Sequence, residues 1–285
     1  MTSNTVTQDI RVDTGALTLV GDAWHPAGSS RGAVLLLHGG GQRRYSWRNT
    51  GSRLATVGWT AYAFDARGHG DSDRAPDGDY SATGLVDDAV HLVDWIGEKP
   101  VMVGASMGGL TALLAEGERG NVARALVLVD VVAHMEPVGI AHIQSFMASA
   151  PDGFASLEEA ADAIAAYNPH RPRPRSVEGL RKNLRLEDDG RWHWHWDPAF
   201  LRAGSEPERE ARPDRTVAAA RRITVPTLLV RGADSDVVSE GGAREMQELI
   251  RHAEVVEVPA AGHMIAGDDN DVFTERLSGF LDELG

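Results

Sequence analysis

The spacing of hydrophobic positions changes after the first two segments of the chain. Thr5–Arg11 and Leu17–Trp24 alternate apolar and polar side chains, with the turn-forming Asp13-Thr14-Gly15 between them, which predicts an antiparallel pair of strands. Short apolar runs then follow, and such runs are typical of strands buried on both faces of a sheet. They are Ala33–Leu37, Thr60–Phe64, Val101–Val103 and Ala125–Val129.

Helical patterns lie between these runs. In Ser81–Ile96 the apolar residues fall along one face, and Ser81 can cap the first turn. Strand and helix alternate again later, with a strand at Thr227–Val230, a helix from about Ser239 to Ile250 and a strand at Glu254–Val258. Because this alternation is typical of parallel sheets, we predict an α/β fold with a mostly parallel, doubly wound sheet.

The alternation stops for 92 residues, from Val131 to Arg222. This stretch contains a helix opened by a capping box of Ser156 and Glu159, a stiff proline segment over 169–174, and alternating Trp and His over 192–196. That is too much local structure for a loop, and its position between two sheet strands predicts an inserted, largely helical cap. We expect a core domain over 1–130 and 223–285 and a cap domain over 131–222.

Composition and charge narrow the classes of partner. The 285 residues include 28 Lys and Arg against 42 Asp and Glu, a net charge of −14, which repels nucleic acid and anionic membranes. The chain has no cysteine, so disulfides, thiolate nucleophiles and Cys-ligated metals are excluded. It has a polar start and no apolar run near the roughly 20 residues that span a bilayer. We therefore expect a cytoplasmic protein that binds neither membrane nor nucleic acid.

The strongest chemical signal is Gly104-Ala105-Ser106-Met107-Gly108-Gly109, which follows a buried-strand run and precedes the helical run Leu110–Ala115. A Gly-x-Ser-x-Gly sequence at a strand-to-helix turn strains the serine backbone and exposes its hydroxyl above the sheet. Ser106 is therefore the candidate nucleophile. The weaker alternative is a glycine-rich turn that only starts a helix or binds a phosphate.

Acyl transfer also needs two backbone N–H donors for the oxyanion and a base for the serine. His38-Gly39-Gly40-Gly41 follows another apolar run, and we assign the donors to Gly40 and Met107. Among 11 histidines, His263 is best placed as the base, because it lies between the last strand candidate and the closing helix. His38 and His69 lie in loops that we expect to be structural.

Two places can supply the acid that orients His263. Asp130 ends the strand after the nucleophile helix, and Asp234 and Asp236 follow the Thr227 strand. Both places lie at carboxyl ends of parallel strands, so geometry permits either. His193 and His195 alternate with tryptophans and could share a metal, but no carboxylate at a suitable spacing supports one. We expect no metal.

Together these residues resemble the α/β-hydrolase superfamily over essentially the whole chain. The motifs His38-Gly39-Gly40, Arg67-Gly68-His69-Gly70, Gly104 to Gly109 and Gly262-His263 occur in the family's order, with a cap where the family inserts one. The chain looks closest to bacterial serine esterases and to proteins labelled non-haem bromoperoxidases or epoxide hydrolases. The resemblance implies a Ser-His-Asp triad and no cofactor. A serine at 106 is incompatible with true epoxide hydrolases, which need a carboxylate nucleophile.

The resemblance also ranks the acids. Many family members have Asp three residues after the glycine that ends the seventh strand, whereas this chain has Ser235 there. In a related esterase subgroup that position is Ser, and the acid is an Asp that follows the nucleophile by 24 residues between Val and Val or Ile. Asp130 has this offset and stands between Val129 and Val131. The resemblance therefore ranks Asp130 first, Asp236 second and Asp234 third.

We expect a cofactor-independent hydrolase that cleaves small carboxylic esters through an acyl-enzyme. A lactonase, a carbon–carbon bond hydrolase, a perhydrolase with haloperoxidase-type activity and a non-catalytic ligand receptor on the same fold stay open as alternatives. Substrate choice is expected in the cap, where an apolar wall could come from Trp192, Trp194, Trp196, Phe146 and Met147. The bland alternative is that these side chains form only the cap's own core. The sequence does not predict the oligomeric state.

Overall fold

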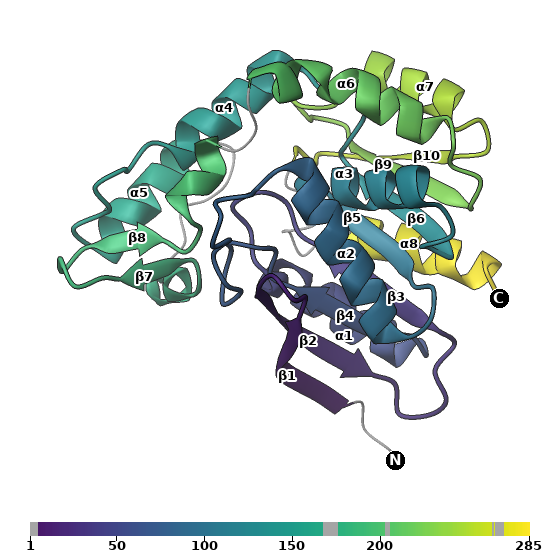
Figure 1. Cartoon of the computed structure of the whole chain (residues 1–285), viewed down its shortest axis with the longest axis horizontal. Coiled ribbons are helices and arrows are strands. Elements are labelled where there is room, and N and C mark those ends of the chain that lie inside the picture. Colours follow the sequence, from purple (N-terminus) through teal and green to yellow (C-terminus); the bar gives the residue numbers. More distant parts are fainter. Residues whose placement is uncertain (1–4, 168–175, 203–205, 264, 266–270) are drawn as a thin grey trace.

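The computed structural model describes residues 5–167, 176–202, 206–263, 265 and 271–285, and the proline segment 169–174 lies outside them. Eight strands form the central sheet in the order β1-β2-β4-β3-β5-β6-β9-β10 (Figure 1). The bounds are β1 Thr5–Asp13, β2 Thr18–His25, β3 Ala33–Leu37, β4 Thr60–Phe64, β5 Val101–Ala105, β6 Ala125–Val129, β9 Thr227–Gly232 and β10 Glu254–Val258.

The sheet is parallel except at the start of the chain. β2 pairs antiparallel with both β1 and β4, and the pairs from β4 through β10 are all parallel. Every residue of β3, β5 and β6 is buried, as expected for central strands covered on both faces. The predicted fold class, a mostly parallel and doubly wound α/β sheet, is confirmed.

Helices cover both faces of this sheet. α1 (Arg48–Thr56) and α8 (Asp271–Glu283) pack on Val34, Leu36 and Val103. On the other face, α2 (Ala82–Ile96), α3 (Met107–Leu114) and α7 (Glu240–Leu249) pack on Leu35 and Met102. Alternate residues of each strand therefore face opposite helix layers. Ser81 caps α2 as predicted, since its hydroxyl accepts a hydrogen bond from the Gly84 N–H at 3.2 Å.

The chain leaves the sheet after β6 and returns at β9. The elements between them include α4 (Pro137–Met147), α5 (Leu157–Tyr167), the antiparallel pair β7 (Leu184–Leu186) and β8 (Trp192–Trp194), and α6 (Glu206–Ala220). Short 3-10 helices lie in the same stretch at Glu178–Lys182 and Pro198–Arg202. In the core, a 3-10 helix at Arg44–Trp47 precedes α1, and a π-helix at Ala115–Arg119 follows α3. Figure 1 shows α4, α5, β7 and β8 projecting to one side of the sheet.

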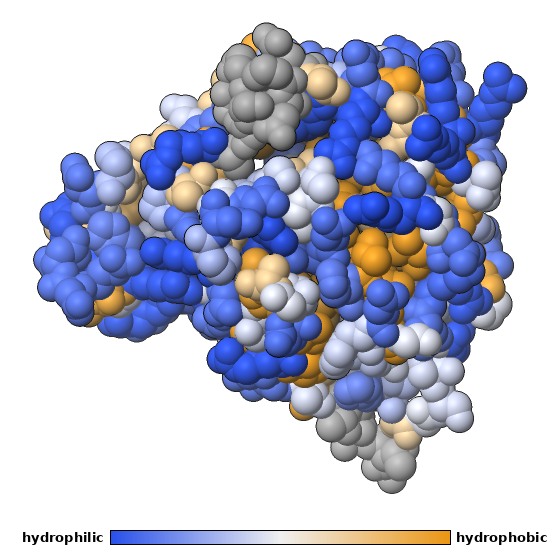
Figure 2. All heavy atoms as spheres, viewed as in Figure 1, coloured by the Kyte–Doolittle hydropathy of each residue, from blue (hydrophilic) through white to orange (hydrophobic). Residues whose placement is uncertain are grey.

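The projecting part has a small core of its own. Its buried side chains are Phe154, Leu157, Ala160, Ala161, Leu180 and Leu184, and its outer surface is largely hydrophilic (Figure 2). α6 differs, because Ala219 and Ala220 near its end are buried in the main core. Among the helices of the described residues, none has both the length and the apolar character needed to span a membrane.

Candidate active site

Ser106 lies at the turn between β5 and α3 in an unusual backbone conformation. Its φ is 48° and its ψ is −113°, a strained conformation that a residue other than glycine adopts only when its surroundings impose it. The Ser106 N–H donates to the Val129 carbonyl at 3.0 Å, and its carbonyl accepts the Leu110 N–H at 2.9 Å. The turn is thus fixed to the neighbouring strand and to the helix.

The glycines around Ser106 make this turn possible. A Cβ on Gly104 would lie 2.3 Å from the Gly108 carbonyl oxygen, and a Cβ on Gly108 would lie 2.3 Å from the Leu37 carbonyl oxygen. Any side chain at either position would push the helix away from the sheet. The glycines of the motif are therefore required by close backbone approach.

His263 and Asp130 lie next to each other at the carboxyl end of the sheet. The His263 Nδ1–H donates to Asp130 Oδ2 at 2.7 Å. Asp130 is fully buried, and its other carboxylate oxygen accepts the Gly232 N–H at 3.0 Å. The carboxylate is therefore fixed from two sides, as an acid that orients an imidazole must be.

Ser235 supplies a further hydrogen bond to the same carboxylate. Its hydroxyl donates to Asp130 Oδ2 at 2.5 Å and accepts the N–H groups of Val237 and Val238 at 3.2 and 3.1 Å. The other candidate acids, Asp234 and Asp236, are exposed. Asp236 lies 3.4 Å from His142. The geometry thus pairs His263 with Asp130.

Ser106 and His263 line one cavity of about 270 Å³. The expected oxyanion donors Gly40 and Met107 and the expected cap residues Phe146, Met147 and Trp196 lie in its wall. Most other lining residues are apolar, as is usual for a pocket that binds small organic molecules. The sequence reasoning did not single out Tyr80, Leu85, Met135, Ile143, Tyr167, Phe200 and Arg212, which also line the cavity.

Trp194, which we expected in the cavity wall, lies one layer behind it. Its ring stacks on Trp196 with 4.7 Å between centroids and meets Phe154 edge-on at 5.2 Å. Trp192 pairs with Phe154 through the backbone and carries the Arg181 guanidinium over its ring at 4.8 Å. These two tryptophans thus pack among the residues between β6 and β9, and Trp194 lies against Trp196, which lines the cavity.

A family model described as the alpha/beta hydrolase fold matches residues 32–269. The chain belongs to the α/β-hydrolase family. It is thus a hydrolytic enzyme.

Relatives of known name agree with the family. The chain is 28% identical to an esterase, Rv0045c, of Mycobacterium tuberculosis, over 95% of this chain and 88% of that protein. A solved structure of that esterase superposes with a TM-score of 0.74, covering 98% of this chain and 92% of the esterase chain. The chain is 30% identical to an sn-1-specific diacylglycerol lipase of Mus musculus, over 92% of this chain and 83% of that protein. A solved structure of E-2-(acetamidomethylene)succinate hydrolase, which is 24% identical, has the same fold. Its TM-score is 0.81, and the match covers 98% of this chain and 100% of that chain.

Two of the remaining histidines of this α/β hydrolase, His193 and His195, lie against different groups. His193 Nε2 lies 2.9 Å from Asp189, whereas His195 is buried and bonds to the backbone of Gly70 and Gly41. The two side chains therefore have separate partners. Within the described residues, no group of three or more His, Cys, Asp or Glu side chains is arranged to hold a metal ion.

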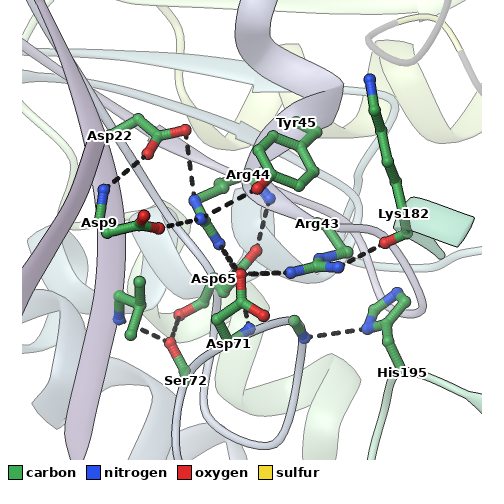
Figure 3. A network of polar contacts seen from close by, with 12 residues as sticks. Asp9, Asp22, Arg43, Arg44, Tyr45, Asp65, Asp71, Ser72, Lys182 and His195 are labelled. Atoms are coloured by element: carbon green, nitrogen blue, oxygen red, sulfur yellow. Dashed lines mark hydrogen bonds and ion pairs between the residues drawn. The ribbon is translucent and has the colours of Figure 1, made fainter. Parts of the chain in front are cut away.

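A buried ion-pair network, which the sequence reasoning missed, supports the loops of the hydrolase beside the cavity (Figure 3). The Arg44 guanidinium, 1% exposed, bonds to Asp65, to Asp71 at 2.7 Å and to Asp9 at 2.8 Å. Asp65 also accepts the N–H groups of Arg44 and Asp71 at 2.7 and 2.9 Å. The network joins the first hairpin to the 65–72 loop. Local sequence patterns do not predict such contacts, because the residues are far apart along the chain.

Proposed function

We propose that this α/β hydrolase cleaves carboxylic esters of small molecules through an acyl-enzyme on Ser106. One observation carries the proposal: the strained Ser106 shares an apolar cavity with a histidine whose Nδ1–H is bonded to a buried carboxylate, 2.7 Å away. This arrangement is the one by which a hydroxyl is activated for attack on an acyl carbon. The names of the relatives, an esterase and a lipase, support the same chemistry.

The reaction proceeds in two halves. In the first, Ser106 Oγ bonds to the acyl carbon while His263 Nε2 takes the hydroxyl proton, and Asp130 stabilises the imidazolium through Nδ1–H. The oxyanion accepts the N–H groups of Gly40 and Met107, and the alcohol leaves with the proton from His263. In the second half, water replaces the alcohol and gives its proton to His263. The acid is released, and Ser106 regains its hydrogen.

The Ser106→Ala variant tests the nucleophile. Without the hydroxyl no acyl-enzyme can form, so kcat on p-nitrophenyl esters should fall by roughly 10³ to 10⁶. Ser145→Ala, an exposed serine on α4, is the matched control and should keep wild-type turnover. A fluorophosphonate should label the wild type at Ser106 alone, as read by mass spectrometry of peptides. A Ser106→Ala variant that keeps a tenth of the activity would disprove the mechanism.

A substrate panel tests the reaction class. Simple acyl esters should be turned over faster than lactones, than substrates with a carbon–carbon bond between two carbonyl groups, and than esters with peroxide and halide. All four reactions would use the same three side chains, so their relative kcat/KM distinguishes the alternatives. A ligand receptor would bind compounds in the cavity without turning over any of them.

A further inference from the structure

The loop that carries Gly40 is fixed by three histidines. We call Gly39–Gln42 the oxyanion loop; it lines the cavity and contains three successive peptide groups. His38 Nδ1–H donates to the Gly39 carbonyl at 2.8 Å. The Gly41 N–H donates to His69 Nε2 at 3.1 Å. His195 Nε2–H donates to the Gly41 carbonyl at 3.2 Å. Each of the three peptides thus has one imidazole partner.

The second nitrogen of each ring fixes its tautomer. His38 Nε2 accepts the Ala66 N–H at 2.9 Å, so its proton is on Nδ1. His69 Nδ1–H donates to the Arg67 carbonyl at 3.0 Å, which leaves Nε2 as the acceptor. His195 Nδ1 accepts the Gly70 N–H at 2.9 Å, so its proton is on Nε2. In a doubly protonated ring, an imidazole N–H would face the backbone N–H that the ring nitrogen now accepts. Each ring is therefore neutral.

Burial agrees with three neutral rings. His38, His69 and His195 are at most 2% exposed, and their ring centroids are separated by 5.3 and 6.0 Å in that order. Burial lowers the pKa of all three, that of His69 to about 3. The charged forms are thus strongly disfavoured at neutral pH.

His195 is the member of this set that comes from the cap. It follows β8, and Figure 3 shows it reaching toward the 65–72 loop. Neighbouring cap residues dock on the same loops: the Asp197 N–H donates to the Gly68 carbonyl at 2.7 Å, Arg185 donates to the Gly70 carbonyl, and Arg43 donates to the Lys182 carbonyl. The cap is therefore joined to the oxyanion loop and to the loop behind it.

We propose that His195 is a positioning residue by which the docked cap holds the Gly41–Gln42 peptide of the oxyanion loop, and so restrains the nearby Gly40 N–H, whose own peptide is held by His38. His38 and His69 belong to the core and hold two peptides of the oxyanion loop, and His195 holds the third only while the cap is in place. The hydrogen bond from His195 to the Gly41 carbonyl is thus the contact by which cap docking acts directly on the oxyanion loop. The catalytic part of this inference rests on the ester hydrolysis proposed above.

Two substitutions at His195 separate its donor from its acceptor. His195→Asn can still accept the Gly70 N–H, but it is too short to donate to the Gly41 carbonyl. His195→Gln places an amide N–H near the position of Nε2 and should restore that bond. We expect kcat to fall by about 10- to 100-fold in His195→Asn with KM within about threefold of the wild type, because a misdirected oxyanion donor acts on the transition state. His195→Gln should recover most of the loss.

Hydrogen exchange over residues 38–43 gives a readout independent of turnover. We expect faster exchange in His195→Asn and near-wild-type exchange in His195→Gln. His193→Asn is the matched control, because His193 bonds to Asp189 in the turn between β7 and β8, and it should change neither measurement. Unchanged exchange in His195→Asn, or changed exchange with unchanged kcat, overturns the inference. A wild type inactive on every ester overturns the proposed function instead, while the exchange data still decide whether His195 holds the loop.

Discussion

Asp130 combines a constrained backbone with a fully occupied carboxylate. Its φ of 51° turns the chain sharply at the end of β6, and its N–H donates to the Val230 carbonyl at 2.7 Å. The carboxylate accepts three hydrogen bonds, from Gly232, Ser235 and His263. Such bonds fix its direction, so the imidazole beside it has one preferred orientation.

Neutralising Asp130 should therefore disable His263. We expect Asp130→Asn to lower kcat by about 10² to 10⁴, because the amide cannot stabilise the imidazolium and can favour the wrong tautomer. Asp236→Asn is the matched control; its side chain is half exposed beside His142, and it should lose little. Kinetics of both variants, with circular dichroism to check folding, make the comparison.

The opposite ranking would contradict this assignment. If Asp236→Asn or Asp234→Asn were the inactive variant and Asp130→Asn stayed active, the acid would belong after β9, where most of the superfamily keeps it. Strand positions inferred from the sequence could not decide this, because both places end parallel strands, and only the family resemblance ranked Asp130 first. The strand positions do not show where each side chain points. In the structure the Asp130 side chain is buried beside His263, whereas the Asp236 side chain is exposed.

Local motifs made Ser106 and His263 predictable, whereas His195 was not predictable. Ser106 stands in a sequence whose glycines are required within four residues of it. His195 acts on Gly41, 154 positions away along the chain, and its alternation with tryptophans suggested a strand face or a metal ligand. Its hydrogen-bond partners, Gly70 and Gly41, depend on how the segment that carries His195 packs on the core loops, and a local sequence pattern does not predict that packing.

Among the elements, the strands were predicted nearly to the residue, and so was the helix opened by Ser156 and Glu159, which is α5, whereas the shorter elements between β6 and β9 were not. β3, β4, β6 and β10 have the expected bounds. For β3, β4 and β6 the reason is that a strand buried on both faces must be a short apolar run. Val177, Leu180 and Leu184 have the spacing of a short helix, yet this segment forms a 3-10 turn over Glu178–Lys182, and Leu184 begins β7. Short cap elements bury only one side, so their patterns are weak.

Two stacked tryptophans at the end of β8 have different positions relative to the cavity. Trp196 lies in the cavity wall and Trp194 lies behind it. We expect Trp196→Ala to change the ranking of acyl chain lengths more than the rate on an acetyl ester, since remote pocket contacts discriminate among substrates. Trp194→Ala should lower the melting temperature and reduce all rates alike. Rates on acetyl to decanoyl esters, with thermal melts, test this; identical profiles for the two variants would refute it.

At the scale of the whole molecule, the buried histidines make stability depend on pH. Each has a folded-state pKa below the ordinary value near 6.5, so the unfolded chain binds more protons as pH falls through 6.5. The free energy of unfolding is then lost toward acid, by up to about 1.4 kcal/mol per pH unit for each ring. For His69 the loss extends down to about pH 3.

Urea unfolding at pH 7.5, 6.5 and 5.5 measures this dependence. His195→Asn should show a shallower loss of stability than the wild type over the same range, because one neutral ring has been removed and the carboxylates are unchanged. The difference should approach one proton. Equal slopes in the two proteins would mean that His195 takes up its proton without unfolding.

The pairing of β6 with β9 has a consequence for synthesis on the ribosome. β9 begins 98 residues after β6 ends (227 − 129 = 98), so one edge of β6 has no partner until the intervening chain has been made. At translation rates of about 5 to 20 residues per second, this interval lasts roughly 5 to 20 s. During it an apolar strand presents open backbone groups to other nascent chains. Slower initiation or a lower temperature should therefore raise the yield of folded protein more than extra time after synthesis.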